Sequence, residues 1–342
     1  MIHFESDYTE GAHPNILKRL FETNMMQSTG YGMDEICLSA QKKIKKAVGC
    51  KADVHFLVGG TQANVIIIDA ILKPYQGVIS ATSGHINVHE TGAVEACGHK
   101  ILAIDSEDGT ITADQVKRLM ENHLSDSSKE HTVQPGMVYI SFPTENGTLY
   151  SKKQLNDLYK VCQHYHLPLF IDGARLGYGL ASPANDLTLK ELAKLCDVFY
   201  IGGTKVGAMM GEAVVITNAA LRQDFRYMIK HRGGMLAKGR MLGIQFDELF
   251  ENDLYFEISK HAIQQAMRIK ETCEECGIPF AYESYTNQQF LCLTDAQTKQ
   301  LEKKFVVSHI EKKEDLNVIR ICTSWATKPE NVDLLIEELK KL

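Results

Sequence analysis

The chain has 342 residues, of which 44% are hydrophobic and 23% are charged, and its formal net charge is −6. This balance predicts a globular protein with one large and one smaller core, and the absence of a long basic stripe argues against a nucleic-acid partner. No apolar run approaches the ~18 residues of a membrane span, and residues 1–7 lack the basic and apolar segments of a secretion signal. The nine scattered cysteines predict free thiols and therefore a cytoplasmic protein.

Short apolar runs alternate with amphipathic segments over the first two thirds of the chain. Seven runs predict buried strands, at residues 54–58, 78–80, 101–104, 137–142, 167–171, 198–201 and 213–217. Helices are predicted where apolar residues recur with 3.6-type spacing, at residues 34–48, 61–72, 112–120 and 152–164. Alternating strands and helices of this kind predict an α/β fold with a mostly parallel seven-stranded sheet.

The pattern changes near residue 240. One long helical stretch is predicted over residues 241–276, followed by short strands at 289–293, 304–308 and 318–322 and a final helix after Pro329. We therefore expect an N-terminal arm and a large domain over residues 1–240, and a smaller α+β domain over residues 241–342.

Two strand ends carry most of the functional signal. Residues 170–175 read Phe-Ile-Asp-Gly-Ala-Arg and residues 200–205 read Tyr-Ile-Gly-Gly-Thr-Lys, so each apolar run ends in a polar, glycine-containing turn. Because ligands bind beyond the carboxyl ends of parallel strands, both turns are expected at one site. Pyridoxal phosphate chemistry needs a lysine that forms a Schiff base and an aspartate that pairs with the pyridinium nitrogen. Each turn alone is also ordinary turn or helix-cap chemistry, so the prediction depends on the pair.

Residues 57–64, Leu-Val-Gly-Gly-Thr-Gln-Ala-Asn, predict a strand, a glycine turn and the start of a helix. The free backbone amides of Gly60, Thr61 and Gln62 would face an anion, although the same residues also suit a plain helix cap. The glycine pattern of dinucleotide-binding folds and the lysine of a nucleotide P-loop are both missing. A single phosphate is therefore the expected ligand.

Two histidines, His85 and His89, lie four residues apart beside Glu90. A zincin motif places its glutamate between the histidines, so zinc is disfavoured and no metal is predicted. His85 is expected to stack on the pyridine ring, with a purely structural imidazole as the competing interpretation. Arg320 lies within an apolar strand, where it must pair with an acidic neighbour or reach a substrate carboxylate. We favour the second role.

Over nearly its whole length the chain resembles the L-threonine aldolase family of fold-type I pyridoxal phosphate enzymes, within the β-eliminating lyase group. The most specific matches are Ser6-Asp7, Gly30-Tyr31-Gly32, Gly60-Thr61-Gln62-Ala63-Asn64, His85, Asp172-Gly173-Ala174-Arg175, Gly203-Thr204-Lys205, Arg320 and Ser324-Trp325. The resemblance implies an aspartate-aminotransferase-like fold and a homotetramer, a dimer of dimers with active sites at the dimer interface. It also implies retro-aldol cleavage of L-threonine, L-allo-threonine or related β-hydroxy-α-amino acids to glycine and an aldehyde.

The same resemblance implies how the cofactor is held. Lys205 would form the Schiff base, Asp172 would pair with the pyridine nitrogen, and His85 would stack on the ring. The residues that would bind around the cofactor phosphate are Gly60, Thr61, Gln62 and Thr204.

The resemblance also assigns the substrate-binding residues. Arg175 would contact the 3-hydroxyl side of the cofactor and, with Ser6 and Arg320, would hold the substrate carboxylate. Tyr31 would reach the site of a neighbouring subunit.

One segment departs from the family pattern. Many of these aldolases carry Asn-Thr-His-Asn-Gly, in which the histidine meets the substrate β-hydroxyl, whereas residues 143–147 here read Pro-Thr-Glu-Asn-Gly. Glu145 thus replaces that histidine, and the chain looks more like the broad-specificity, phenylserine-aldolase-type branch. Either His85 or Glu145 is expected to handle the β-hydroxyl proton.

Other functions remain open from the sequence. A different pyridoxal phosphate reaction, β-elimination or transamination, would use nearly the same residues. A catalytically silent binding protein and a metal hydrolase centred on the two histidines are the remaining alternatives.

Overall fold

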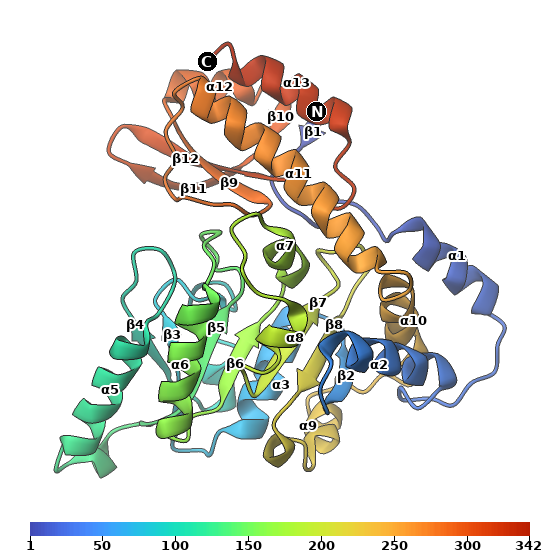
Figure 1. Ribbon diagram of the computed structural model, residues 1–342, viewed down its shortest axis with the longest axis vertical. Coiled ribbons are helices and arrows are strands. Elements are labelled where there is room, and N and C mark those ends of the chain that lie inside the picture. Colours follow the sequence, from blue (N-terminus) through green and yellow to red (C-terminus); the bar gives the residue numbers. More distant parts are fainter.

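The computed structural model describes residues 1–342 and contains a large seven-stranded sheet (Figure 1). Its strands are β2 (Asp53–Leu57), β3 (Gln76–Ala81), β4 (Ile101–Ile104), β5 (Gln134–Ser141), β6 (Leu169–Asp172), β7 (Val198–Gly202) and β8 (Glu212–Ile216). Their order is β2-β8-β7-β6-β5-β3-β4, and only β8 runs antiparallel to its neighbours. All seven predicted strands are present, which confirms the predicted α/β class and the mostly parallel sheet.

Helices cover both faces of this sheet. Alternate residues of each strand point to opposite faces, and both sets of residues are apolar, so both faces are buried. Val138 and Ile140 of β5 belong to one hydrophobic core, whereas Met137 and Tyr139 belong to another. Helices on the first face include α2 (Glu35–Val48), α5 (Ala113–Ser125), α6 (Lys152–His164) and α8 (Leu189–Leu192). Helices on the second face are α3 (Gly60–Ile71) and α9 (Phe225–His231).

A second layer contains the end of the chain (Figure 1). An antiparallel sheet in the order β11-β12-β9 is formed by β9 (Gln288–Leu293), β11 (Ser308–Lys313) and β12 (Leu316–Cys322). It shares a core with α11 (Leu254–Glu275), α12 (Asp295–Leu301) and α13 (Pro329–Leu339). The N-terminal strand β1 (Ile2–His3) also belongs here, because it pairs in parallel with β10 (Phe305–Val306).

The remaining helices lie mainly in connections. They are α1 (Pro14–Thr23), α4 (His85–Val88), α7 (Leu176–Ala181) and α10 (Arg240–Leu249), with 3₁₀ turns at Glu95–Cys97, Lys129–His131 and Ala219–Leu221. None of the helices combines the length and the apolar content that a membrane crossing requires.

Two predicted elements differ from the structure. The helical stretch expected over residues 241–276 is broken between α10 and α11, where Asn252 and Asp253 adopt positive φ angles of 50° and 59°. The strand expected at residues 304–308 is divided into β10 and the start of β11. Most of β11 is exposed, so it lacks the apolar alternation by which a strand is predicted. The domain boundary at residue 240 stays a prediction.

Two glycines bring the ends of β6 and β7 together. A Cβ atom on Gly173 would lie 1.9 Å from the carbonyl oxygen of Tyr200, and one on Gly202 would lie 2.2 Å from that of Ala174. The Gly202 N–H donates to the Gly173 carbonyl at 2.9 Å. The absence of side chains here allows the turn that follows β6 to lie directly beside the turn that follows β7.

We expect Gly173→Ala to destabilise the protein, because the new methyl group collides with backbone that cannot rotate away. The loss in the free energy of unfolding should reach about 3 kcal/mol, the upper range for overpacking a core. Thermal and urea unfolding measure it. Gly11→Ala is the matched control, because its Cβ meets nothing within 4 Å. Equal stability of the two variants would contradict the close approach.

Candidate active site

Asp172 ends β6 and points to the α3 face, because it lies two residues after Phe170, which packs there. Its carboxylate accepts hydrogen bonds from the Tyr139 hydroxyl at 2.7 Å, from Asn64 Nδ2 at 3.1 Å and from the Ala174 N–H at 3.0 Å. Burial opposes ionisation, but the nearby His85 and these hydrogen bonds outweigh it and lower the pKa of Asp172. The carboxylate is therefore ionised at neutral pH.

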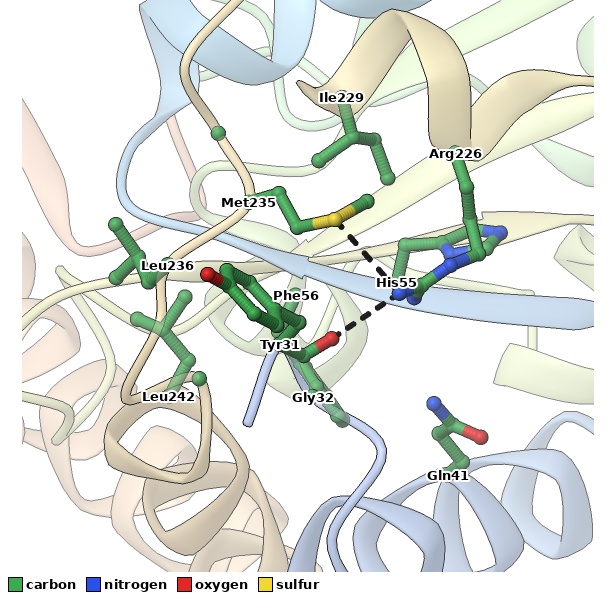
Figure 2. Close-up of a pocket in the computed structure, with 12 residues that line it drawn as sticks. Tyr31, Gly32, Gln41, His55, Phe56, Arg226, Ile229, Met235, Leu236 and Leu242 are labelled. Atoms are coloured by element: carbon green, nitrogen blue, oxygen red, sulfur yellow. Dashed lines mark hydrogen bonds between the residues drawn. The ribbon is translucent and has the colours of Figure 1, made fainter. Parts of the chain in front are cut away.

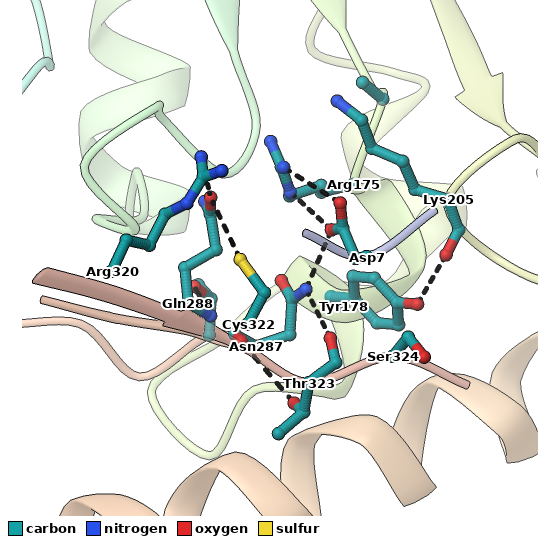
Figure 3. Close-up of polar contacts among 12 residues, drawn as sticks. Asp7, Arg175, Tyr178, Lys205, Asn287, Gln288, Arg320, Cys322, Thr323 and Ser324 are labelled. Atoms are coloured by element: carbon teal, nitrogen blue, oxygen red, sulfur yellow. Dashed lines mark hydrogen bonds and ion pairs between the residues drawn. The ribbon is translucent and has the colours of Figure 1, made fainter. Parts of the chain in front are cut away.

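Lys205 lies in the turn after β7, and its backbone carbonyl accepts a hydrogen bond from the Tyr178 hydroxyl at 2.5 Å (Figure 3). Burial and the neighbouring Arg175 guanidinium lower the pKa of Lys205, against the opposing effect of nearby carboxylates. Asp172 is one of those carboxylates. Because the Gly202 N–H donates to the Gly173 carbonyl, the strand ends that carry Asp172 and Lys205 lie side by side. An amine with a lowered pKa is more readily neutral, which is the form that attacks a carbonyl carbon.

Glu212, at the start of β8, holds the turn that carries Lys205. Its Oε1 accepts a hydrogen bond from the Thr204 hydroxyl at 3.0 Å, and its Oε2 accepts one from the Gly203 N–H at 3.2 Å. Burial raises the pKa of Glu212 to about 8. The sequence interpretation missed this residue and expected the Thr204 hydroxyl to bind phosphate, whereas here that hydroxyl is engaged within the chain. The available signal was an acidic residue opening an otherwise apolar strand.

The first turn of α3 contains the residues at which the sequence predicts an anion to bind. The residue before it, Gly59, offers no side chain to cap the helix. The backbone N–H groups of Gly60, Thr61 and Gln62 have no acceptor within the chain. Free amides and the positive end of a helix dipole together attract an anion such as phosphate.

Arg175 follows the first turn and is held by a residue to which the sequence analysis gave no role. Its Nε and Nη2 donate to the two carboxylate oxygens of Asp7 at 2.7 and 3.0 Å (Figure 3). Asn287 Nδ2 donates to the same carboxylate at 2.9 Å. Although burial acts in the opposite direction, Arg175 and then Lys205 lower the pKa of Asp7. Nη1 of Arg175 has no partner within the chain, so its N–H groups can make other contacts.

Arg320 lies on β12, facing the same region. Its Nη1 donates to Gln288 Oε1 at 3.2 Å and its Nη2 to the Glu5 carbonyl at 2.9 Å, while its buried Nε has no partner. In Figure 3 the side chains of Arg320, Arg175 and Lys205 extend in the same direction. Ser6 is buried in the chain segment beside them.

His85 and Glu145 lie together, as expected of two groups that could serve the same proton. The backbone N–H of His85 donates to Glu145 Oε1 at 3.0 Å, and the Ser141 hydroxyl donates to the same oxygen at 2.6 Å. Burial raises the pKa of Glu145. The His85 ring makes a 2.9 Å contact with Glu90 through Nδ1, and its Nε2 has no partner within the chain.

The structure does not bring Tyr31 to these residues within one chain. Figure 2 shows it beside His55 and Arg226, lining a separate cavity of about 30 Å³. The Arg226 guanidinium donates to the Tyr31 carbonyl at 3.2 Å. Tyr31 is 47% exposed.

Comparison with known proteins shows the family of the chain. The model of the beta-eliminating lyase family matches residues 3–296. The low specificity L-threonine aldolase of Pseudomonas aeruginosa is 28% identical over 308 residues, which cover 88% of this chain and 87% of that protein.

Solved structures extend the comparison. A threonine aldolase from Leishmania major superposes with a TM-score of 0.96 at 42% identity, covering 100% of this chain and 99% of that one. An aspartate aminotransferase mutant from Thermus thermophilus shares the fold, with a TM-score of 0.74, 15% identity, and coverage of 100% of this chain and 91% of that one. The chain therefore belongs to the beta-eliminating lyase family, among its threonine aldolases.

Proposed function

We propose that the protein is a pyridoxal phosphate-dependent aldehyde-lyase that cleaves L-threonine, L-allo-threonine or related β-hydroxy-α-amino acids to glycine and an aldehyde. The observation that carries the proposal is the placement of Asp172 and Lys205 at the adjoining ends of the paired strands β6 and β7. The 42% identity to a threonine aldolase supports this reaction over others of the same fold.

The groups in the site fit pyridoxal phosphate. The uncapped amides of α3 would hold the phosphate, Asp172 would pair with the ring nitrogen, and Lys205 would attach the cofactor covalently through its amine. When bound, the cofactor supplies an electron-withdrawing ring that accepts the electron pair of the broken Cα–Cβ bond. Asp172, because it stays ionised, would keep the ring nitrogen protonated.

Two cationic side chains and one hydroxyl would orient the substrate. Arg320, Ser6 and the free Nη1 of Arg175 would hold the substrate carboxylate, which limits rotation at Cα. Asp7 keeps the Arg175 guanidinium in one orientation, so this contact needs no rearrangement.

One residue must remove the proton of the β-hydroxyl as the Cα–Cβ bond breaks, and the aldehyde then leaves. His85 is favoured for this role because its Nε2 has no partner, whereas Glu145 Oε1 already accepts two hydrogen bonds. Glu145 would instead shape the pocket for the substrate side chain. A proton delivered to Cα completes glycine.

The purified protein with added pyridoxal phosphate should release glycine and the matching aldehyde from L-threonine, L-allo-threonine or phenylserine. Lys205→Ala should lose the visible absorbance of the bound cofactor, and its activity should fall by at least ~10³-fold because the covalent attachment is lost. Product analysis measures both. Release of a keto acid and ammonia, or amino-group transfer, would show a different pyridoxal phosphate reaction.

Glu145→His should change the ratio of kcat/KM values for threonine and phenylserine by about tenfold, because an imidazole there would contact the β-hydroxyl. Steady-state kinetics with both substrates measures the ratio. Glu145→Gln is the control, since it removes the charge and keeps the size. An unchanged ratio in Glu145→His would exclude Glu145 from substrate selection.

We further propose a cytoplasmic homotetramer, a dimer of dimers with Tyr31 reaching a neighbouring site. All nine cysteines are free, which suits a reducing compartment. Large apolar side chains are exposed over α1, α2 and the segment between them, with Phe21 85% and Met25 88% exposed. The others are Leu17, Met26, Tyr31, Met33 and Leu38.

Sedimentation equilibrium should give four times the 38.3 kDa chain mass. Phe21→Glu should shift the equilibrium toward smaller species, because it places a charge on the apolar surface. A monomer at micromolar concentration would contradict the proposed assembly.

A further inference from the structure

Glu90 is a buried carboxylate to which the proposed mechanism gives no task. Its side chain is fully inaccessible to solvent. Its Oε1 accepts hydrogen bonds from Asn64 Nδ2 at 2.7 Å and from His85 Nδ1 at 2.9 Å, and its Oε2 is buried without a partner. Burying a charge is costly unless partners compensate for it. The contacts with Asn64 and His85 are therefore what stabilises the buried carboxylate of Glu90.

Asn64 connects this carboxylate to the cofactor end of the site. The same Nδ2 that donates to Glu90 also donates to Asp172 Oδ2 at 3.1 Å. Ionised carboxylates only accept hydrogen bonds, so the NH₂ group of Asn64 must be the part that faces them. The orientation of this amide is therefore fixed by its neighbours.

The contact with Glu90 also decides which nitrogen of His85 carries the proton. A carboxylate at Nδ1 requires Nδ1–H, so in the neutral ring Nε2 holds the lone pair. The backbone N–H of His85 is bound by Glu145, which fixes the start of α4. Glu90 thus holds the ring and Glu145 holds the backbone of His85, with Nε2 left free.

We propose that Glu90 is a positioning residue that holds His85 with its proton on Nδ1, so that Nε2 takes the proton of the substrate β-hydroxyl. Asn64 links this pair to Asp172. The proposal rests on the proposed function. In the step itself the β-hydroxyl proton would pass to Nε2 as the Cα–Cβ bond breaks and the aldehyde leaves, and the bound cofactor would supply the acceptor for the electron pair of that bond. The resulting imidazolium is stabilised by the negative charge of Glu90.

Several charged groups face His85 and together set its titration. Burial favours the neutral ring, but Glu90 and Asp172 outweigh burial and the opposing Lys205 and raise the pKa of His85. Glu145 and His89 are the other titratable neighbours. Because a base must be neutral to accept a proton, kcat/KM should fall as the pH decreases through this raised pKa. Removing Glu90 alone should move that fall to lower pH.

Glu90→Gln in the holoenzyme tests the proposal. We expect kcat for β-hydroxy amino acid cleavage to fall on the order of 10²-fold, the scale of general-base catalysis, with KM changed less than about threefold. The fall of kcat/KM on the acidic side of its pH profile (the acidic limb) should move about one pH unit lower. Exchange of the glycine α-proton in D₂O needs no β-hydroxyl and should change less than about threefold. The control Glu95→Gln makes the same change at an exposed position of the same segment.

Two measurements separate this role from a merely structural one. The proton NMR signal of a hydrogen-bonded imidazole N–H, assigned to His85 by its absence in His85→Phe, should move upfield in Glu90→Gln, because a neutral amide oxygen is a weaker acceptor than a carboxylate. In the double variant Glu90→Gln/His85→Phe, cleavage should equal that of His85→Phe alone, because Glu90 acts through the imidazole. Losses that multiply in the double variant would contradict the proposal.

Thermal unfolding shows whether Glu90→Gln folds. If it does not fold, Glu90→Asp, which keeps the charge, replaces it in the test. It should keep the wild-type acidic limb and recover at least about tenfold of the lost kcat. A shifted limb in Glu90→Asp would overturn the proposal. A wild type that releases no glycine overturns the proposed function and this role together. An active wild type, with unchanged kcat and acidic limb in Glu90→Gln, overturns the role of Glu90 alone.

Discussion

The ion pair of Asp7 and Arg175 joins the three parts of the chain that form the site. Asp7 comes from the N-terminal arm, Arg175 from the turn after β6 of the large sheet, and Asn287, which binds the same carboxylate, from the approach to β9 of the small sheet. The Asp7 side chain is fully buried. Because removal of one member of a buried pair leaves an unmatched charge, such a loss costs about 3–5 kcal/mol. The relative placement of arm and sheets around Lys205 depends on this contact.

Three buried carboxylates each hold a different part of the site in place. Glu212 secures the turn that carries Lys205, and Asp172 keeps its charge through hydrogen bonds from neighbouring strands and from α3. Asp7 keeps Arg175 aligned. Each carboxylate is satisfied by groups from a different element, so the site is ordered by the chain itself. A substrate arriving there meets cations whose directions are already set, which reduces the entropy lost on binding.

Sequence reasoning reached the strand ends because their signal is local. An apolar run closed by a glycine turn marks Asp172 and Lys205 without knowledge of any distant residue. The residues that surround these two have no comparable local pattern. Asp7 contacts Asn287, which lies 280 positions away in the sequence. Glu212 is a single acidic residue at the start of an otherwise apolar strand. The exposed strand β11 shows no alternation, and the break between α10 and α11 rests on positive φ angles at Asn252 and Asp253. Contacts of this kind are fixed by tertiary packing, which outweighs local propensity.

The pairing of β1 with β10 has a consequence for how the protein is made. Residues 2 and 3 are synthesised long before their partners, residues 305 and 306. While the large sheet assembles during translation, the N-terminal arm therefore remains without its partner strand β10. Asp7 can contact Arg175 and Asn287 together only after residue 287 has been synthesised. A nascent chain consequently acquires the contact of arm, large sheet and small sheet only after the segment before β9 has emerged.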